Sequence, residues 1–239
     1  MNTYYTVQSK YTSSIINGIA THEMGHALGL DHSNSTSSVM FPYTFYSDGS
    51  LARTTTSPGS DDKAALASLY GHLAIAPQSD VSANPDVKSD NIVMLHPSWA
   101  VGYKDIQSLA KDADMIIEGT IEHSKLKKNA PDDFLSYKTE HTIQITDVLK
   151  GDRSFKHSSM SFNQLGGIDS YASVTYDTGT LLHKGDHVIL FLRKDDNGEY
   201  SLINENDSIF FAGDLTKKEY KYLKNNEKFT KDQIQAKIK

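Results

Sequence analysis

The chain has 239 residues, a formal net charge of −6 and no cysteine. The acidic balance excludes nucleic acid as the main partner, because a surface that binds phosphates needs an excess of Lys and Arg. The lack of cysteine excludes disulfides, so a metal ion in this protein has to be held by His, Asp or Glu.

Composition changes near residue 75, which predicts two domains. The length suits one large domain or two small ones, and the 38% of hydrophobic residues is enough for packed cores. Residues up to Ala76 are rich in Ser, Thr and Tyr, whereas the rest of the chain is densely charged. The stretch Ala76–Asp86 is rich in Pro, Ser, Asp and Asn and lacks periodicity, as is typical of a linker. We therefore expect domains over residues 1–76 and 104–239, joined by a linker over residues 77–103.

The first domain is predicted to contain two helices joined by a polar loop. A serine or threonine at positions 12–14 can cap a helix that continues to Ala27, because isoleucines recur in it at helical spacing. Gly29 follows, where the chain has to turn sharply. A second helix is expected to begin at Ser60–Asp62, with acidic residues in its first turn, and to end at Gly71.

The second domain is predicted to be rich in short strands, which makes the fold class α+β. One helix is expected around residues 104–113. Turn signals such as Lys184-Gly185-Asp186 separate several apolar runs, and such punctuation favours a small antiparallel barrel or sandwich. The expected strands are residues 115–121, 137–149, 160–164, 188–192 and 200–203.

The end of the first helix carries a pattern typical of a metal site. Residues four apart share one face of a helix, so His22 and His26 can present their imidazoles to one metal ion. The turn that Gly29 permits brings His32 back as a third ligand. Three neutral nitrogens and a water molecule make an open, catalytic zinc site, in which Glu23 can act as the general base. Two such histidines also occur on ordinary solvated helices, but the third His and the Gly favour the metal site.

The residues after His32 extend the pattern. The HExxHxxGxxH spacing of residues 22–32, followed by a turn at Met40, resembles the metzincin zinc peptidases. Ser33 after the third His, the spacing to Met40 and the Phe41-Pro42 pair are similar to the matrixin branch, the matrix-metalloprotease-like peptidases. The helix that ends in Leu69-Tyr70-Gly71 resembles the matrixin closing helix.

This resemblance implies a function and further site residues. It implies one catalytic Zn²⁺ held by His22, His26 and His32, and hydrolysis of peptide bonds in a polypeptide substrate. Met40 would form an apolar floor beneath the zinc ligands without binding the metal. Pro42, Tyr43 and Thr44 would line the pocket for the substrate side chain just after the cleaved bond, although matrixins often have Tyr where this chain has Thr44. Ca²⁺ would belong to a longer form, since this sequence shows no site for it.

The length before the zinc motif departs from the matrixin pattern. Matrixin catalytic domains place a mixed sheet and a helix before the zinc helix, whereas only 21 residues precede His22. We therefore expect residues 1–76 to be the C-terminal, helical half of a metzincin catalytic domain that is truncated at its N-terminus. Residues 1–10 lack the basic and apolar regions of a secretory signal peptide. The resemblance implies an extracellular protein, which would need a signal peptide. A truncated N-terminus would therefore also explain why residues 1–10 lack its features.

Two functional hypotheses stay open, together with minor candidate sites. The second domain loosely resembles β-rich accessory domains of exported Gram-positive bacterial proteins. The alternative to an active zinc endopeptidase is therefore a weak or inactive zinc-binding remnant, whose second domain binds a cell-surface or extracellular ligand. His183 and His187 are four apart, but a turn at Gly185 disfavours a metal role, and His141 is interpreted as a sheet residue. No apolar run approaches the roughly 18 residues of a membrane span.

Overall fold

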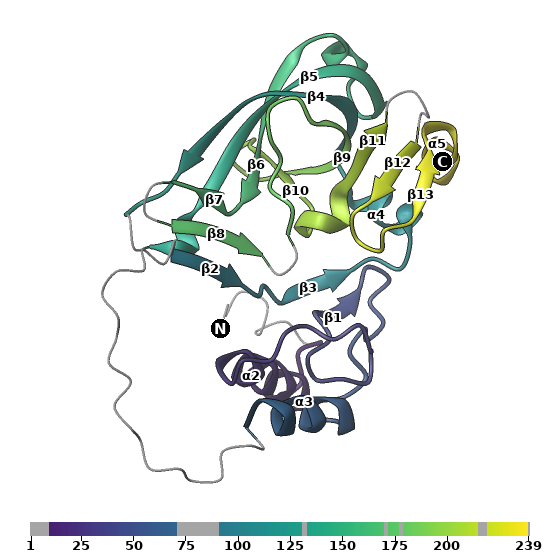
Figure 1. The fold of residues 1–239 in the computed structure, drawn as a ribbon. Coiled ribbons are helices and arrows are strands. Elements are labelled where there is room, and N and C mark those ends of the chain that lie inside the picture. Colours follow the sequence, from purple (N-terminus) through teal and green to yellow (C-terminus); the bar gives the residue numbers. More distant parts are fainter. Residues whose placement is uncertain are drawn as a thin grey trace. The chain divides into compact units, whose positions relative to one another are not determined.

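The computed structural model of the chain describes residues 10–70, 91–130, 133–169, 172–176, 179–214 and 219–238. These residues form two compact units that contain both helices and strands, in agreement with the predicted α+β class (Figure 1). The first unit holds residues 10–70 and 96–102, and the second holds residues 91–95 and those from 103 onward.

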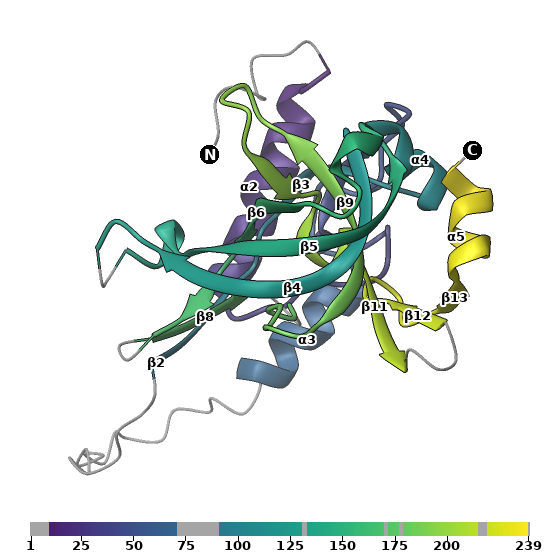
Figure 2. The same cartoon turned by 90° about the horizontal axis from the view of Figure 1, so that it is seen from above.

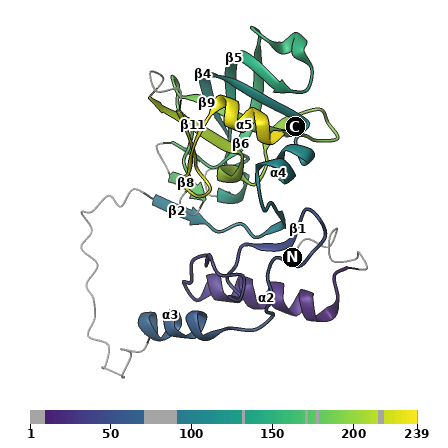
Figure 3. The same ribbon diagram turned by 90° about the vertical axis from the view of Figure 1, so that its right-hand side faces the viewer.

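The first unit consists of two helices and a short parallel sheet. Helix α2 (Ser13–Ala27) and helix α3 (Ser60–Tyr70) lie on the same side of strand β1 (Tyr43–Tyr46) (Figure 3). Strand β3 (Trp99–Gly102) pairs with β1. Thr12 is the N-cap of α2, and its side-chain oxygen accepts a hydrogen bond from the Ile15 amide at 3.4 Å. The helices therefore begin where capping and charge predict.

The second unit is built around a curved eight-stranded sheet (Figure 2). A separate three-stranded sheet has the order β2-β8-β7, and helices α4 and α5 pack against each other. The predicted helix and all five predicted strands are present, with ends shifted by a few residues. The elements are β2 (Asn91–Leu95), α4 (Ile106–Asp112), β4 (Met115–Lys127), β5 (Lys138–Lys150), β6 (Ser159–Leu165), β7 (Gly167–Ile168), β8 (Ala172–Tyr176), β9 (His187–Lys194), β10 (Tyr200–Leu202), β11 (Ile209–Asp214), β12 (Glu219–Tyr222), β13 (Lys228–Thr230), α5 (Lys231–Ile238) and three short 3₁₀ turns.

Five strands of this sheet close into a barrel. Strand β10 pairs with β9 on one side and with β6 on the other, which completes the ring β4-β5-β6-β10-β9. A five-stranded closed sheet of this kind is the size of an OB-fold barrel. Its interior is filled by apolar side chains that alternate along the strands, among them Ile117, Ile143, Phe162 and Leu190. The predicted barrel is thus present in the second unit.

Two sequence-based expectations need correction. The pairing is not purely antiparallel, because β6–β10, β2–β8 and β1–β3 are parallel. Parallel partners require long connections, and alternation within one strand does not reveal them. The predicted linker over residues 77–103 is also wrong in its second half, because β2 and β3 lie there. Residues 71–90, with Gly71 and the Pro-rich stretch, lie outside the described residues. In the described part of the chain, no helix is both long and apolar enough to cross a membrane.

Candidate metal centre

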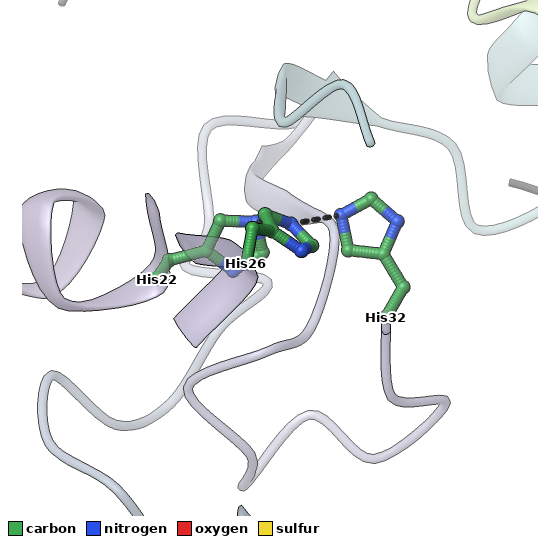
Figure 4. Close-up of side chains that lie close together, drawn as sticks. All are labelled: His22, His26 and His32. Atoms are coloured by element: carbon green, nitrogen blue, oxygen red, sulfur yellow. Dashed lines mark hydrogen bonds between the residues drawn. The ribbon is translucent and has the colours of Figure 1, made fainter. Parts of the chain in front are cut away.

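Three histidine side chains of the first unit converge on one point. His22 and His26 project from α2, and His32 faces them from the loop that follows (Figure 4). The Nε2 atom of His26 lies 3.1 Å from that of His22 and 3.2 Å from that of His32. Ligands placed tetrahedrally at the usual zinc–nitrogen distance would be about 3.3 Å apart. The spacing predicted from the sequence therefore produces a set of nitrogens that fits a zinc ion.

Backbone carbonyls orient two of the three rings. Nδ1 of His22 lies 2.8 Å from the carbonyl oxygen of Val39, and Nδ1 of His26 lies 2.8 Å from that of Leu30. A carbonyl can only accept, so each Nδ1 carries the hydrogen and each Nε2 keeps a free lone pair. Burial, together with the nearby charge of Arg53, lowers the pKa of His22 to about 3. The neutral imidazole that a metal requires is thus the favoured form.

The turn after α2 explains how His32 reaches its partners. The amide of Gly29 donates to the carbonyl of His26 at 2.9 Å, and the amide of Leu30 donates to that of Gly25 at 3.0 Å. This pair of bonds is a Schellman motif, which needs a left-handed residue after the helix. Gly29 supplies it with φ of +82°. Glycine at this position therefore directs the chain back toward the metal ligands.

Met40 packs against the inner face of α2. It is 2% exposed and forms a small apolar cluster with Leu30, Val39 and the partly buried Leu66. A side-chain carbon at Gly25, on the inner face of α2, would collide with the Met40 sulfur. The absence of a side chain at Gly25 lets the methionine fit directly under the zinc helix.

Asp62 fixes the methionine turn to α3, a role that the sequence interpretation missed by treating it as a helix-terminus charge. Its carboxylate accepts hydrogen bonds from the Ser38 hydroxyl, from the Val39 amide at 3.1 Å and from the Gly59 amide at 2.7 Å. Burial would raise the pKa of Asp62, but these donated bonds outweigh it and lower the pKa. The ionised carboxylate therefore ties the loop that contacts His22 to the second helix.

Arg53 is a second buried charge that the sequence did not reveal. Its guanidinium donates to the carbonyls of Gly18 and Val39, at 3.2 and 3.1 Å, and to the hydroxyl of Thr44 at 3.3 Å. Burial lowers the pKa of Arg53 to about 10, and the charge of Glu23 opposes this shift. Because the Val39 carbonyl also binds His22, Arg53 belongs to the hydrogen-bond network that positions the first ligand.

Glu23 follows His22 on α2 and remains exposed to solvent. Partial desolvation raises the pKa of Glu23, although the charges of Arg53 and His32 favour its ionised form. A carboxylate whose pKa is shifted toward neutrality is suited to accept a proton and later return it. The chemistry expected of Glu23 is thus compatible with its surroundings.

Tyr43 and Thr44 begin β1, and Pro42 directly precedes the strand. Thr44 is 5% exposed and bonds Arg53, Tyr43 packs edge-on against Phe41, and the carbonyl of Pro42 accepts from the Trp99 amide at 2.9 Å. A cavity of about 450 Å³ lies elsewhere in the unit, between α3 and the loop after α2. Its lining includes His32, Met40 and Asp62, but none of the three predicted pocket residues.

A fourth histidine stands beside the cluster. His96, in the segment that leads into β3, stacks on His26 with ring centroids 4.9 Å apart and planes 15° apart. Its Nε2 lies 3.6 Å from a carboxylate oxygen of Asp31, and its ring is 6.1 Å from that of His32. The sequence contained no local signal for this contact, because 64 residues separate His96 from His32.

The minor histidine candidates have other partners. His187 lies 3.3 Å from the Glu118 carboxylate and 3.0 Å from the Thr120 hydroxyl, while His183 lies in the turn before β9. His141 is fully buried on β5, between the Ser124 hydroxyl at 2.8 Å and the side-chain oxygen of Gln164 at 3.1 Å. Within the described residues, the one group of three metal-binding side chains detected is His22, His26 and His32.

Comparison with known proteins agrees with this geometry. The family model described as Matrixin matches residues 2–71. Residues 2–71, called the matrixin segment below, are thus similar to this family. Macrophage metalloelastase from Oryctolagus cuniculus is 47% identical over 53 residues, which cover 22% of this chain and 11% of that protein. Matrilysin from Rattus norvegicus is 49% identical over 53 residues, which cover 22% of this chain and 18% of that protein. The chain thus matches less than a fifth of the length of either relative, and His96 lies beyond the matched segment.

Proposed function

We propose that this chain is a zinc-dependent endopeptidase that hydrolyses peptide bonds in proteins. The observation that carries the proposal is the convergence of three Nε2 atoms next to Glu23, inside the matrixin segment. His22, His26 and His32 hold the zinc ion, and Met40 supports them from below. We assign an extracellular location and a polypeptide substrate to the protein by the same family relationship.

Each residue has a defined part in the reaction. When bound, zinc supplies a Lewis acid that polarises the scissile carbonyl and lowers the pKa of the attacking water. Glu23 takes the proton of that water and delivers it to the leaving amine, and such help is typically worth about 10²–10⁴-fold in rate. Arg53 keeps the Val39 carbonyl, and through it His22, in place. Pro42, Tyr43 and Thr44 border the substrate on the β1 side.

The test separates metal binding from catalysis. Chelator-stripped protein is reloaded with zinc and assayed on casein or gelatin, beside the Glu23→Gln and His26→Ala variants. We expect about one zinc ion per chain in the wild type and in Glu23→Gln, and a strong loss in His26→Ala. Glu23→Gln should lose nearly all cleavage, since the base is gone while the ligands remain. Substantial turnover by Glu23→Gln would remove Glu23 from the mechanism.

A second candidate function is a weak or inactive zinc-binding unit. The exposure of large apolar side chains on α2, at its C-cap and on α3 favours this candidate: Met24 is 64%, Leu28 44% and Leu69 53% exposed. In that case the second unit carries the activity, by binding a ligand on a cell surface or outside the cell. Full zinc content without any Glu23-dependent cleavage would select this candidate over the enzyme.

A further inference from the structure

Strand β3 brings a distant part of the chain into the first unit. It pairs in parallel with β1, and the aligned residues are Tyr43 with Trp99, Phe45 with Val101 and Tyr46 with Gly102. Hydrogen bonds lie at both ends of the pair: the Trp99 amide donates to Pro42 at 2.9 Å, and the Ser47 amide donates to Gly102 at 3.0 Å. Residues 91–95 and those from 103 onward belong to the second unit. A short segment of residues 96–102 is therefore inserted in the first unit alone.

The same segment begins at the metal ligands. The ring of His96 stacks on that of His26, a zinc ligand, and its Nε2 faces the carboxylate of Asp31 next to His32. The side chain of His96 is 21% exposed. Residues 96–102 thus run from the histidine cluster along β1, which starts three residues after Met40.

A polypeptide substrate would bind at the same edge of β1, next to the histidine cluster. An extended peptide binds a protein most simply by adding a strand to a sheet edge, where main-chain hydrogen bonds hold it. Residues 50–52 already pair along one edge of β1, where the Ala52 amide donates to Thr44 at 3.0 Å and the Tyr46 amide donates to Ser50 at 2.8 Å. The other edge of β1 pairs with β3, so it is open to a peptide only when β3 is absent. A peptide on β1 would also have to present a bond to the zinc ligands, where His96 now lies.

We propose that residues 96–102 are an internal competitor of the substrate: they occupy the edge of β1 and the side of the zinc cluster, and they must leave before an extended polypeptide can bind. The proposal rests on the proposed function, and it adds regulation at the same site. The segment presents an imidazole ring to the cluster, and the bond after His96 leads into Pro97. It therefore blocks the site without offering a peptide bond with an N–H for cleavage there.

Single substitutions can release the segment. Trp99→Pro removes the N–H that bonds Pro42, and proline cannot donate to a strand ladder, whereas Trp99→Phe keeps the N–H and an aromatic ring as the matched control. Gly102→Val acts independently, because a side-chain carbon at Gly102 would collide with the ring of Tyr43. None of these residues belongs to the proposed catalytic set.

The binding test uses the zinc-loaded, 239-residue chain with Glu23→Gln, so that no peptide is cleaved. A fluorescein-labelled heptapeptide with the sequence of residues 96–102 is titrated against each variant by anisotropy. A tethered segment competes at an effective concentration on the order of millimolar, so the parent and Trp99→Phe should bind the peptide weakly. Trp99→Pro and Gly102→Val should bind it at least about tenfold more tightly. Equal affinities in all four proteins would overturn the proposal.

A second measurement needs no release variant. Trp99 is the single tryptophan of the chain, so its emission reports on the segment itself. Excess unlabelled heptapeptide with Phe in place of Trp should shift the emission of the parent protein to the red and increase quenching by acrylamide. If the peptide binds without any change in Trp99 emission, the peptide and residues 96–102 do not share a site, and the proposal is overturned.

Activity then separates this proposal from the proposed function. With Glu23 intact, Trp99→Pro should lower KM for an unstructured peptide relative to Trp99→Phe and leave kcat nearly unchanged. Tighter binding of the heptapeptide by the release variants, without cleavage by any variant, would refute the proposed peptidase activity. It would still support the proposal that residues 96–102 compete with a bound peptide. Cleavage of the parent chain within residues 96–102, detected by mass spectrometry, would instead make the segment a substrate and overturn the proposal.

Discussion

The second unit buries Ile117, Leu190 and Ile209 completely in a cluster that fills its barrel. In the first unit, the described members of the cluster around Met40 are Leu30, Val39 and the partly buried Leu66. The first unit instead relies on hydrogen bonds to the buried charges of Arg53 and Asp62. Apolar burial is non-directional, whereas hydrogen bonds and metal ligands fix positions. The second unit is therefore stabilised mainly by its apolar core, whereas the first unit is organised around its histidine cluster.

Removing the metal should produce the largest difference in stability between the two units. Because zinc binding is coupled to folding in small units with little core, chelation or His26→Ala should abolish the ordered state of the first unit and leave the second folded. Trp99 emission reports on the first unit, and hydrogen–deuterium exchange of the amides of β4 and β9 reports on the second. His183→Ala, which changes an exposed histidine of the second unit, is the control and should keep its zinc. A single transition that shifts both signals together would contradict two independent units.

A core substitution should have the converse effect. Leu190 is 0% exposed on β9, so Leu190→Ala should destabilise the second unit by about 2–5 kcal/mol. Leu135→Ala, at a site that is 79% exposed, should change stability by less than about 0.5 kcal/mol. Urea denaturation followed by circular dichroism measures both variants. The zinc affinity of Leu190→Ala should equal that of the wild type, and a marked loss would show that the barrel supports the metal site.

The third prediction concerns the carboxylate that joins the methionine turn to α3. Asp62→Asn replaces an acceptor of three hydrogen bonds by a group with one acceptor oxygen, so buried donors lose their partner. Such a loss costs about 1–3 kcal/mol, and it should appear as weaker zinc binding in a chelator competition assay. Asp61→Asn is the matched control. Asp61 is exposed and accepts a long hydrogen bond of 3.4 Å from the Ser33 hydroxyl, so this variant should bind zinc like the wild type. Equal affinities for the two variants would show that Asp62 does not position the ligands.

The same contrast explains what the sequence could predict. The limits of α2, the turn at Gly29 and the three metal ligands depend on neighbours within a few residues, so local patterns reveal them. Strand β5 is predicted from its alternating apolar residues, and the first half of β4 from its apolar run. Arg53 and Asp62 bond Val39, 14 and 23 residues away, and His96 stacks on His26, 70 residues away. No local pattern encodes those contacts. Strand β3 falls within the predicted linker, because its four residues are too few to show a periodic pattern.

The smallest expected effect lies in an ion-pair network on the second unit. Lys231, at the start of α5, contacts the carboxylates of Glu118 and Asp147, each at 2.6 Å. Burial would raise the pKa of Glu118, but hydrogen bonds from His187, Lys231 and Tyr220 lower it to about 2. The hydrogen bond from Lys231, aided by Lys156, also lowers the pKa of Asp147 to about 2.

Both carboxyl groups bind protons more weakly in the folded state than in the unfolded state. Their contribution to stability is therefore complete above the unfolded pKa values of 4.5 and 3.8 and is lost as the pH falls toward 2. Lys231→Met should cost about 1 kcal/mol at pH 7, since the network is partly exposed and screened by solvent. The difference from the wild type should shrink below pH 4.5 and continue to shrink as the pH falls through 2. Lys228→Met breaks an exposed pair with Glu219 at 3.9 Å and should have no measurable effect at either pH. A Lys231→Met difference that stays constant from pH 7 to pH 2 in urea denaturation would show that Lys231 stabilises α5 by packing rather than by charge.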